Sequence, residues 1–273
     1  MRKRLALLAS AVLLVLAGCP GGSPAGAPTP YEVSRQSTLH KVLDRKKLVV
    51  GLEAKFWPFE YDDGTGRPKG FDVDLIRLLA EALGVELEVR DINFDGLIPS
   101  LLDGKVDIVC SGMTATLERA RTVSFSEPYF RTGLCLLVSD RRGAGILGAQ
   151  HLDREDVVIA LKTGTTGHIV ADKRFPKAQK RIFRDEGACA LEVAQGRADA
   201  FVYDQISIAK HARAYADTTR AILEPFTHEP YAIATRQGEA DLLRFIDQFL
   251  RTVREDGRLA EIERRHLGEL LGR

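Results

Sequence analysis

The sequence is poor in several residue types, and each scarcity narrows the class of protein it can encode. Its 273 residues include four cysteines, two methionines and one tryptophan, and 7% are aromatic. It contains no CxxC pair and no cysteine–histidine cluster with metal-site spacing, so we expect no metal and no cofactor. Net charge is only +1, from 39 basic and 38 acidic residues. Because nucleic-acid binding needs a basic surface, no nucleic-acid partner is expected.

Three of the four cysteines lie in the body of the chain: Cys110, Cys135 and Cys189. An odd number leaves at least one free thiol in an exported protein. Cys110 follows Ile108-Val109 and Cys135 precedes Leu136-Leu137. Both are therefore predicted at buried strand positions, where cysteine behaves as a small hydrophobic residue.

Long apolar runs are also absent, apart from one at the N-terminus. Three basic residues, 2–4, precede an apolar run over 5–17 that is too short to span a bilayer comfortably and is typical of a signal peptide. The run ends in Leu-Ala-Gly-Cys19, which resembles a bacterial lipobox. An ordinary secretory peptide with an incidental cysteine, or an uncleaved anchor, is the alternative.

We therefore expect a lipoprotein signal peptide over 1–18, with Cys19 lipidated as the mature N-terminus. Residues 19–37 are rich in proline and glycine and should form a flexible tether. These features predict a protein of the periplasm or cell surface that is attached to the lipid bilayer through its acylated N-terminus.

Beyond the tether, short strands and amphipathic helices alternate twice. Strands are expected over 48–52, 85–89 and 106–109, with helices from 71 to a stop at Gly84 and over 98–102. A second set follows, with strands over 157–160, 181–183 and 200–203 and helices over 165–174 and 188–195. A strand over 134–138 could carry the chain between the two sets, and two helices, 242–253 and 258–266, complete it. This order predicts two α/β lobes with mostly parallel sheets around a cleft.

Ligands of open α/β sheets bind beyond the carboxyl ends of the strands. An aromatic segment follows the first strand: Phe59 and Tyr61 are expected to anchor it. Phe56 and Trp57 could either do the same or form the wall of a ligand site.

A hydroxyl-rich segment follows the strand over 106–109. Ser111 and Thr114 offer hydroxyl groups, and Gly112 lets the backbone approach a ligand closely. Thr116 is expected to cap a helix that carries Arg119 in its first turn. An arginine at a helix start is ordinarily a surface residue, but in a cleft-facing loop its guanidinium suits bidentate binding of a carboxylate.

Two segments of the second set face the same cleft. Thr165 and Thr166 open a helix whose free N–H groups could bind an anion, although a simple helix cap is the alternative. The segment lacks the Gly-Lys-Ser/Thr of a phosphate loop. Asp204 follows the strand over 200–203 and could cap the next helix or hold an ammonium group. Together with Arg119, these residues would form the polar frame for an α-amino acid.

Several motifs, in this order, resemble the polar amino-acid-binding proteins of bacterial ABC importers, family 3 of the extracellular solute-binding proteins. Along the chain, the matching segments are Pro58–Glu60, Gly70–Leu75, Ser111–Arg119, Phe125–Tyr129, Gly164–Thr166 and Ala198–Asp204. The resemblance implies a type II periplasmic-binding-protein fold. Lobe 1 would comprise 38–130 plus 229–273 and lobe 2 would comprise 131–228, with hinges near 128–133 and 224–230.

The resemblance also implies roles for individual residues. Arg119 would bind the α-carboxylate with Thr114 and the Thr165/Thr166 turn, and Asp204 would bind the α-ammonium. Phe56 and Phe94 would enclose the ligand side chain. The implied function is capture of a polar L-amino acid for delivery to a membrane-embedded ABC permease, without catalysis.

An enzyme of the same fold is the alternative, namely a periplasmic dehydratase acting on cyclohexadienyl or arogenate-type compounds. In those enzymes, the resemblance suggests, a glutamate acting as general acid replaces the amine-binding aspartate. The side chain of Asp204 is shorter than that of the glutamate, and its sequence context gives no obvious desolvation that would raise its pKa. A sensor ectodomain would need a transmembrane helix or a further domain, which we do not expect.

Glu53 and Lys162 follow strands of opposite lobes and should both face the cleft. Glu53 could pair with a cationic side chain, Lys162 with an anionic one, or the two with each other when the lobes close. The third arrangement resembles the glutamine-type members of the family and would suit a neutral polar ligand, since burying an uncompensated charge is costly. Solvated rim charges without a role in specificity are the remaining alternative.

Overall fold

The computed structural model describes residues 36–271. The predicted signal peptide and nearly all of the predicted tether, with Cys19, fall outside this range. Within it, no helix is both long enough and apolar enough to cross a membrane.

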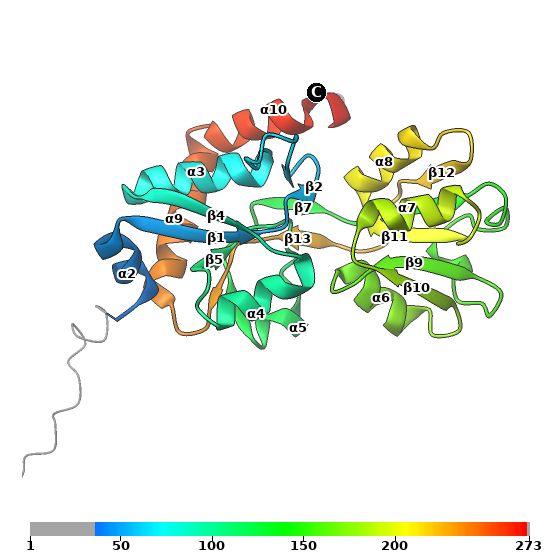
Figure 1. The fold of residues 1–273 in the computed structure, drawn as a ribbon, viewed down its shortest axis with the longest axis horizontal. Coiled ribbons are helices and arrows are strands. Elements are labelled where there is room, and N and C mark those ends of the chain that lie inside the picture. Colours follow the sequence, from blue (N-terminus) through cyan, green and yellow to red (C-terminus); the bar gives the residue numbers. More distant parts are fainter. Residues whose placement is uncertain (1–35, 272–273) are drawn as a thin grey trace, which may run out of the picture.

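Two α/β lobes lie side by side (Figure 1), each built on a five-stranded sheet. The sheet of the first lobe has the order β4-β1-β5-β14-β6. Its strands are β1 Lys47–Leu52, β4 Glu86–Asp91, β5 Ile108–Val109, β6 Val123–Phe125 and β14 Ala234–Arg236. β1 pairs in parallel with β4 and β5, whereas β14 is antiparallel to β5 and β6. Its helices are α2 Thr38–Arg45, α3 Phe71–Leu83, α4 Leu97–Leu102, α5 Leu117–Ala120, α9 Ala240–Glu255 and α10 Arg258–Leu271, with a 3-10 turn η1 at Phe94–Gly96.

The second lobe repeats this plan with the order β10-β9-β11-β8-β12. Its strands are β8 Leu134–Ser139, β9 Val158–Lys162, β10 Gln179–Phe183, β11 Ala200–Asp204 and β12 Thr219–Ile222. β10, β9 and β11 are parallel, and β8 is antiparallel to both β11 and β12. Its helices are α6 Thr166–Arg174, α7 Glu186–Ala194 and α8 Gln205–Ala214, with a 3-10 turn η2 at Ala149–His151. The predicted two-lobed α/β fold is confirmed.

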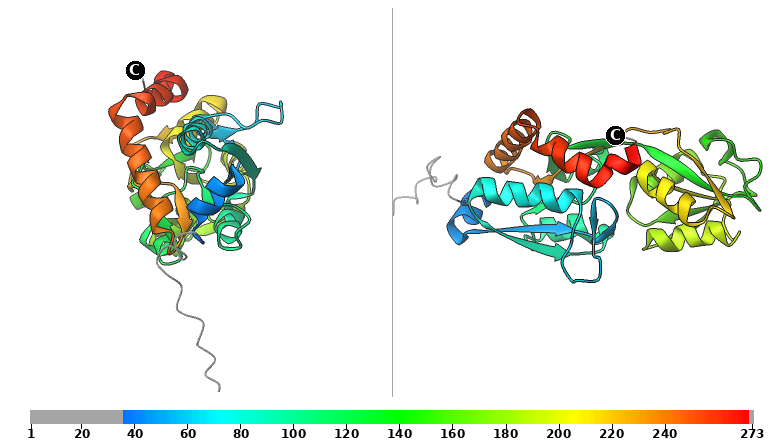
Figure 2. Two further views of the ribbon diagram at one scale, coloured as in Figure 1. Left: turned by 90° about the vertical axis from the view of Figure 1, so that its left-hand side faces the viewer. Right: turned by 90° about the horizontal axis from the view of Figure 1, so that it is seen from above.

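Local sequence signals account for most of these elements. α3 ends where predicted, because Gly84 takes up the left-handed conformation (φ 66°) that closes a helix. The hydroxyl of Thr116 caps α5, and that of Thr165 caps α6. The last helix, α10, extends beyond the predicted end at 266 to Leu271 and packs on α3 and α9 (Figure 2).

The connection between the lobes differs from the prediction in one respect. The run over 134–138 does not carry the chain across, because β8 is an interior strand of the second sheet, with all six residues buried. The crossing is made by β7 Phe130–Thr132 and β13 Glu229–Tyr231, which pair antiparallel. β7 lies within the implied hinge segment 128–133, and β13 overlaps the end of the segment 224–230 by two residues and extends one residue beyond it. The predicted limits of lobe 2, 131 and 228, fall in β7 and directly before β13.

A further hairpin, β2 Lys55–Phe56 with β3 Glu60–Tyr61, projects from the first lobe after β1. Phe59 is buried within it and stacks on Phe56, with ring centroids 5.1 Å apart. The three cysteines of the described chain are free and buried, as expected for Cys110 and Cys135.

Candidate ligand-binding site

One cavity between the lobes brings together all eleven of the ligand-binding residues predicted from the sequence. They are Glu53, Phe56, Phe94, Ser111, Gly112, Thr114, Arg119, Lys162, Thr165, Thr166 and Asp204. The space among these side chains, open solvent included, is about 310 Å³. A larger hollow of about 1120 Å³ opens on the second lobe beside Phe175 and Phe226, but none of the predicted residues lines it.

Two further residues line the cavity, Glu60 and Tyr203. Glu60 belongs to a motif recognised in the sequence, but no role was assigned to it. Tyr203 is the penultimate residue of β11, next to Asp204. Its position at the carboxyl end of a parallel strand was the signal that could have identified it.

The loop after β5 forms the floor of the cavity in the first lobe. Gly112 has φ +49°, and a Cβ atom there would lie 2.5 Å from the ring of Phe56, so the loop and the aromatic wall fit only with glycine. The Ser111 hydroxyl accepts a hydrogen bond from the Glu53 amide (3.0 Å) and donates one to Glu60 (2.7 Å). Ser111 is therefore already bonded within the protein, whereas no hydrogen bond holds the Thr114 hydroxyl among the described residues.

Arg119 is a buried cation that forms no ion pair with the residues that the structure describes. Its guanidinium donates to the carbonyl oxygen of Thr114 (2.8 Å) and, across the lobes, to that of Gly164 (3.0 Å). It lies 5.4 Å from the centre of the Phe94 ring. Within residues 36–271 no carboxylate is within ion-pair distance of it. Burial lowers the pKa of Arg119, although arginine stays charged. A buried, unpaired cation favours the binding of an anion.

The turn between β9 and α6 faces Arg119 from the second lobe. The Thr165 hydroxyl caps α6, accepting from the His168 amide (3.4 Å), and donates to the carbonyl oxygen of Lys162 (2.8 Å). Thr166 is the first residue of α6 and lines the cavity. The simple helix cap and a cavity-facing helix N-terminus are thus both present, and free N–H groups at such a terminus attract negative charge.

Asp204 is a buried carboxylate with one oxygen left free. It occupies the N-cap position of α8, but its side chain makes no capping hydrogen bond, and Oδ1 has no partner in the described chain. Burial raises its pKa to about 7; the Tyr231 hydroxyl opposes the rise, and the charges of Glu229 and Glu186 add to it. The expectation that Asp204 lacks desolvation was therefore wrong, because the folded chain buries its side chain, and β13 and α7 add the charges of Glu229 and Glu186. A carboxylate in this state favours a cationic partner.

Glu53 and Lys162 form a buried ion pair across the lobes, each side chain being 2% exposed. Of the arrangements considered from the sequence, the structure has the one in which they pair with each other, and they are not solvated rim charges. The amide of Phe94 donates a second hydrogen bond to Glu53 (3.2 Å). The pair contributes no net charge to the cavity.

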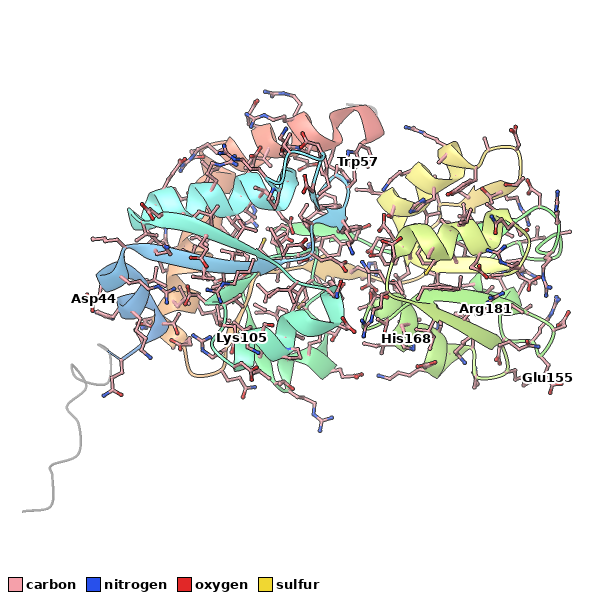
Figure 3. The ribbon with its side chains drawn as sticks, viewed as in Figure 1. Asp44, Trp57, Lys105, Glu155, His168 and Arg181 are labelled. Atoms are coloured by element: carbon pink, nitrogen blue, oxygen red, sulfur yellow. The ribbon has the colours of Figure 1, made fainter. Side chains whose placement is uncertain are left out.

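The aromatic residues divide between wall and rim. Phe56 and Phe94 both line the cavity. Trp57 does not: it lies at the edge of the first lobe facing the second (Figure 3), where the Lys210 ammonium of α8 is 5.9 Å from its ring. Phe59 is an anchor as expected, packed against Phe71 and Phe130.

Taken together, the cavity is lined by a buried guanidinium, the buried carboxyl groups of Asp204 and Glu60 and a neutral ion pair, with aromatic walls. No group of three or more potential metal-ligating side chains occurs in the part of the chain that the structure describes.

The chain is similar to several known proteins. The ABC transporter glutamine-binding protein GlnH of Bacillus subtilis is 29% identical over 272 residues, covering 97% of this chain and 96% of that protein. Cyclohexadienyl dehydratase of Pseudomonas aeruginosa is 28% identical over 84% of this chain and 85% of its own length. A binding component of an ABC transporter from Wolinella succinogenes, solved in complex with lysine, superposes with a TM-score of 0.76 at 35% identity, covering 81% of this chain and 96% of that one.

The match to the family itself covers most of the chain. Residues 48–269 match the family described as bacterial extracellular solute-binding proteins, family 3. This span includes both sheets apart from Lys47 at the start of β1, both crossing strands and every residue that lines the cavity. The chain belongs to family 3 of the bacterial extracellular solute-binding proteins.

Proposed function

We propose that this protein captures a polar L-amino acid between its lobes, outside the cytoplasm, and delivers it to an ABC permease. The observation that carries the proposal is the pair of complementary buried groups, Arg119 and Asp204, neither of which has an ion-pair partner within the described chain. An α-amino acid supplies both missing charges, because its carboxylate pairs with the guanidinium and its ammonium with the Asp204 carboxylate.

The Glu53–Lys162 pair favours a neutral side chain, such as that of glutamine. A cationic ligand side chain would have to displace Lys162 from Glu53, leaving a buried ammonium without its partner. The glutamine-binding relative fits this proposal, whereas the lysine complex shows that a basic ligand is found on the same fold. The favoured class is therefore neutral polar amino acids, and basic ones are the alternative.

A binding screen tests the proposal directly. The purified protein without its tether is unfolded thermally in the presence of each of the twenty L-amino acids, with D-glutamine as the stereochemical control. A ligand at 100 times its dissociation constant stabilises the folded state by about 2.7 kcal/mol, which is a readily measured shift. If none of the twenty shifts the transition, the protein does not bind amino acids and the proposal fails.

A dehydratase activity is the second candidate, because two observations favour it. One relative is a cyclohexadienyl dehydratase, and Asp204 has a pKa of about 7, which suits a general acid. Incubation with arogenate, followed by chromatography, distinguishes the two functions. Turnover that is abolished in Asp204→Asn would make the protein an enzyme; unchanged arogenate together with tight amino-acid binding supports the transport role.

We further propose that the protein is a lipoprotein attached at Cys19. The basic segment 2–4, the apolar run 5–17 and the small residues before Cys19 support cleavage there. One acyl chain gives only marginal membrane binding, so stable attachment requires more than one.

A further inference from the structure

Two carboxyl groups lie directly behind the cavity, and neither is used by the proposed ligand frame. Glu60 is on β3 and lines the cavity, and Asp72 is in the first turn of α3. Both residues are fully buried. No lysine, arginine or histidine of residues 36–271 is within ion-pair distance of either group. Two buried negative charges in this position would be strongly unfavourable.

Each of the two carboxyl groups has one oxygen in a hydrogen bond and one oxygen without a donor among the described residues. Glu60 Oε1 accepts from the Ser111 hydroxyl (2.7 Å), and Asp72 Oδ2 accepts from the Gly112 amide (2.7 Å) and the Tyr129 hydroxyl (2.7 Å). Glu60 Oε2 and Asp72 Oδ1 are buried and have no donor. The two carboxyl groups lie close together, because their other oxygens bind the consecutive residues Ser111 and Gly112, and each group affects the pKa of the other. A single proton between them would satisfy both remaining oxygens.

The surroundings place that proton on Glu60. Burial, and then the charge of Asp72, raise the pKa of Glu60 well above its usual value. Burial also raises the pKa of Asp72, but three donors oppose the rise, since Tyr129, the Gly112 amide and the Cys110 thiol all face it. The ammonium of Lys162 faces Glu60 from the second lobe and opposes its protonation only as a weaker contribution. Asp72 is thus the better stabilised anion and Glu60 the better proton carrier.

We propose that Glu60 and Asp72 share one proton, and that this proton makes Glu60 a positioning residue for the ligand-binding loop. With it, a continuous chain of hydrogen bonds runs from the Glu53 amide through Ser111, Glu60 and Asp72 to the Gly112 amide. The chain fixes the two loop residues that form the floor of the cavity. The importance of that loop depends on the proposed function, but the proton can be tested without any ligand.

Glu60→Gln is the variant that separates a shared proton from a buried charge. The amide offers an N–H toward Asp72 and an oxygen to Ser111, so it reproduces the hydrogen bonds of the protonated acid without a titrating group. Asp199→Asn is the matched control, since Asp199 is also a buried carboxylate but pairs with Arg142 and accepts from the Val158 amide. Both variants and the wild type are unfolded thermally and chemically, without ligand, between pH 6 and 9.

The native wild type holds a proton that the unfolded chain has released over this range, so its stability falls as pH rises. Relative to Glu60→Gln, its unfolding equilibrium constant is expected to rise up to tenfold per pH unit. The unfolding constant of Asp199→Asn should instead exceed that of the wild type by a factor independent of pH. Identical pH slopes for Glu60→Gln and the wild type would overturn the proposal.

Two further measurements identify the proton and its role. In the infrared spectrum, the carbonyl band of a protonated carboxyl group should persist after Asp204 has ionised in the wild type and in Asp199→Asn, but not in Glu60→Gln. Hydrogen exchange of the Gly112 amide should stay slow in Glu60→Gln and accelerate at least tenfold in Glu60→Ala. Absence of the band from the wild type, or unchanged exchange in a folded Glu60→Ala protein, would overturn the assignment. If the amino-acid screen identifies no ligand, the proposed function is rejected, but the stability, infrared and hydrogen-exchange measurements still test the shared proton.

Discussion

The affinity of this protein for its amino acid should depend on pH through Asp204. Its pKa of about 7 in the empty cavity means that a proton must leave before the carboxylate can pair with a ligand ammonium. The affinity is therefore fully present above pH 7 and is lost as pH falls through that value. At pH 5 about 1% of the protein has Asp204 ionised, so the dissociation constant should be about 100-fold higher than at pH 8. This ratio corresponds to a loss of about 2.7 kcal/mol of binding free energy, because a tenfold change in the dissociation constant is about 1.36 kcal/mol.

Isothermal titration calorimetry with L-glutamine, or with the tightest ligand of the screen, measures this dependence between pH 5 and 8.5. Repeating the titration at pH 6 in buffers of different ionisation enthalpy should show release of close to one proton per ligand bound. Asp204→Asn should bind at least 100-fold more weakly at pH 8, with no pH dependence. Asp199→Asn, whose carboxylate lies outside the cavity, should follow the wild-type profile.

The unliganded protein should show the opposite trend, which provides an internal check. A carboxyl group whose pKa is raised in the folded state stabilises the protein at pH values below its pKa in the unfolded chain, which is about 4. This stabilisation is lost as the pH rises to about 7. The stability of the wild type should therefore fall over this range relative to that of Asp204→Asn. A dissociation constant that is unchanged from pH 5 to 8 in the folded wild type would refute the reasoning, because Asp204 would then be ionised before the ligand arrives.

Four further outcomes are expected. Arg119→Ala should weaken binding at least 100-fold in calorimetry while the protein stays folded, because the ligand carboxylate loses the buried guanidinium that pairs with it; unchanged affinity would reject the α-amino-acid frame. A double-mutant cycle of Glu53→Gln and Lys162→Met should give a coupling of at least 1 kcal/mol in ligand binding. A coupling near zero, together with arginine or lysine as the tightest ligand, would reject the proposal that this ion pair selects a neutral side chain. Gly112→Ala should lower stability by about 1–3 kcal/mol and binding at least tenfold, since its Cβ atom would meet an aromatic ring at 2.5 Å; wild-type values in both would contradict the packing. Cys19→Ser should move the protein from the membrane to the soluble fraction in cell fractionation, and a variant that stays with membranes would contradict lipid attachment.

The sequence by itself determined the order of elements and the set of residues around the cavity. Helix and strand signals are local: α3 required only its apolar stripe and Gly84, and α5 and α6 required a hydroxyl at the cap. Because parallel strands present their carboxyl ends at one edge of a sheet, knowing where strands end was enough to select residues such as Arg119 and Asp204. The same local signals could not distinguish β8, an interior antiparallel strand, from a crossing strand, since both are short apolar runs.

Only the tertiary structure decided the electrostatic state of the site. The pKa of Asp204 depends on burial and on Glu229, which arrives from a strand 25 residues further along the chain. The Glu53–Lys162 pair joins positions 109 residues apart, and the sequence could only offer it as one of several arrangements. Glu60 was part of a recognised motif, yet its contact with Asp72 depends on how the β2–β3 hairpin packs against α3. Charge and protonation follow from desolvation and from distances between segments remote in sequence, and these are fixed only when the lobes fold and meet.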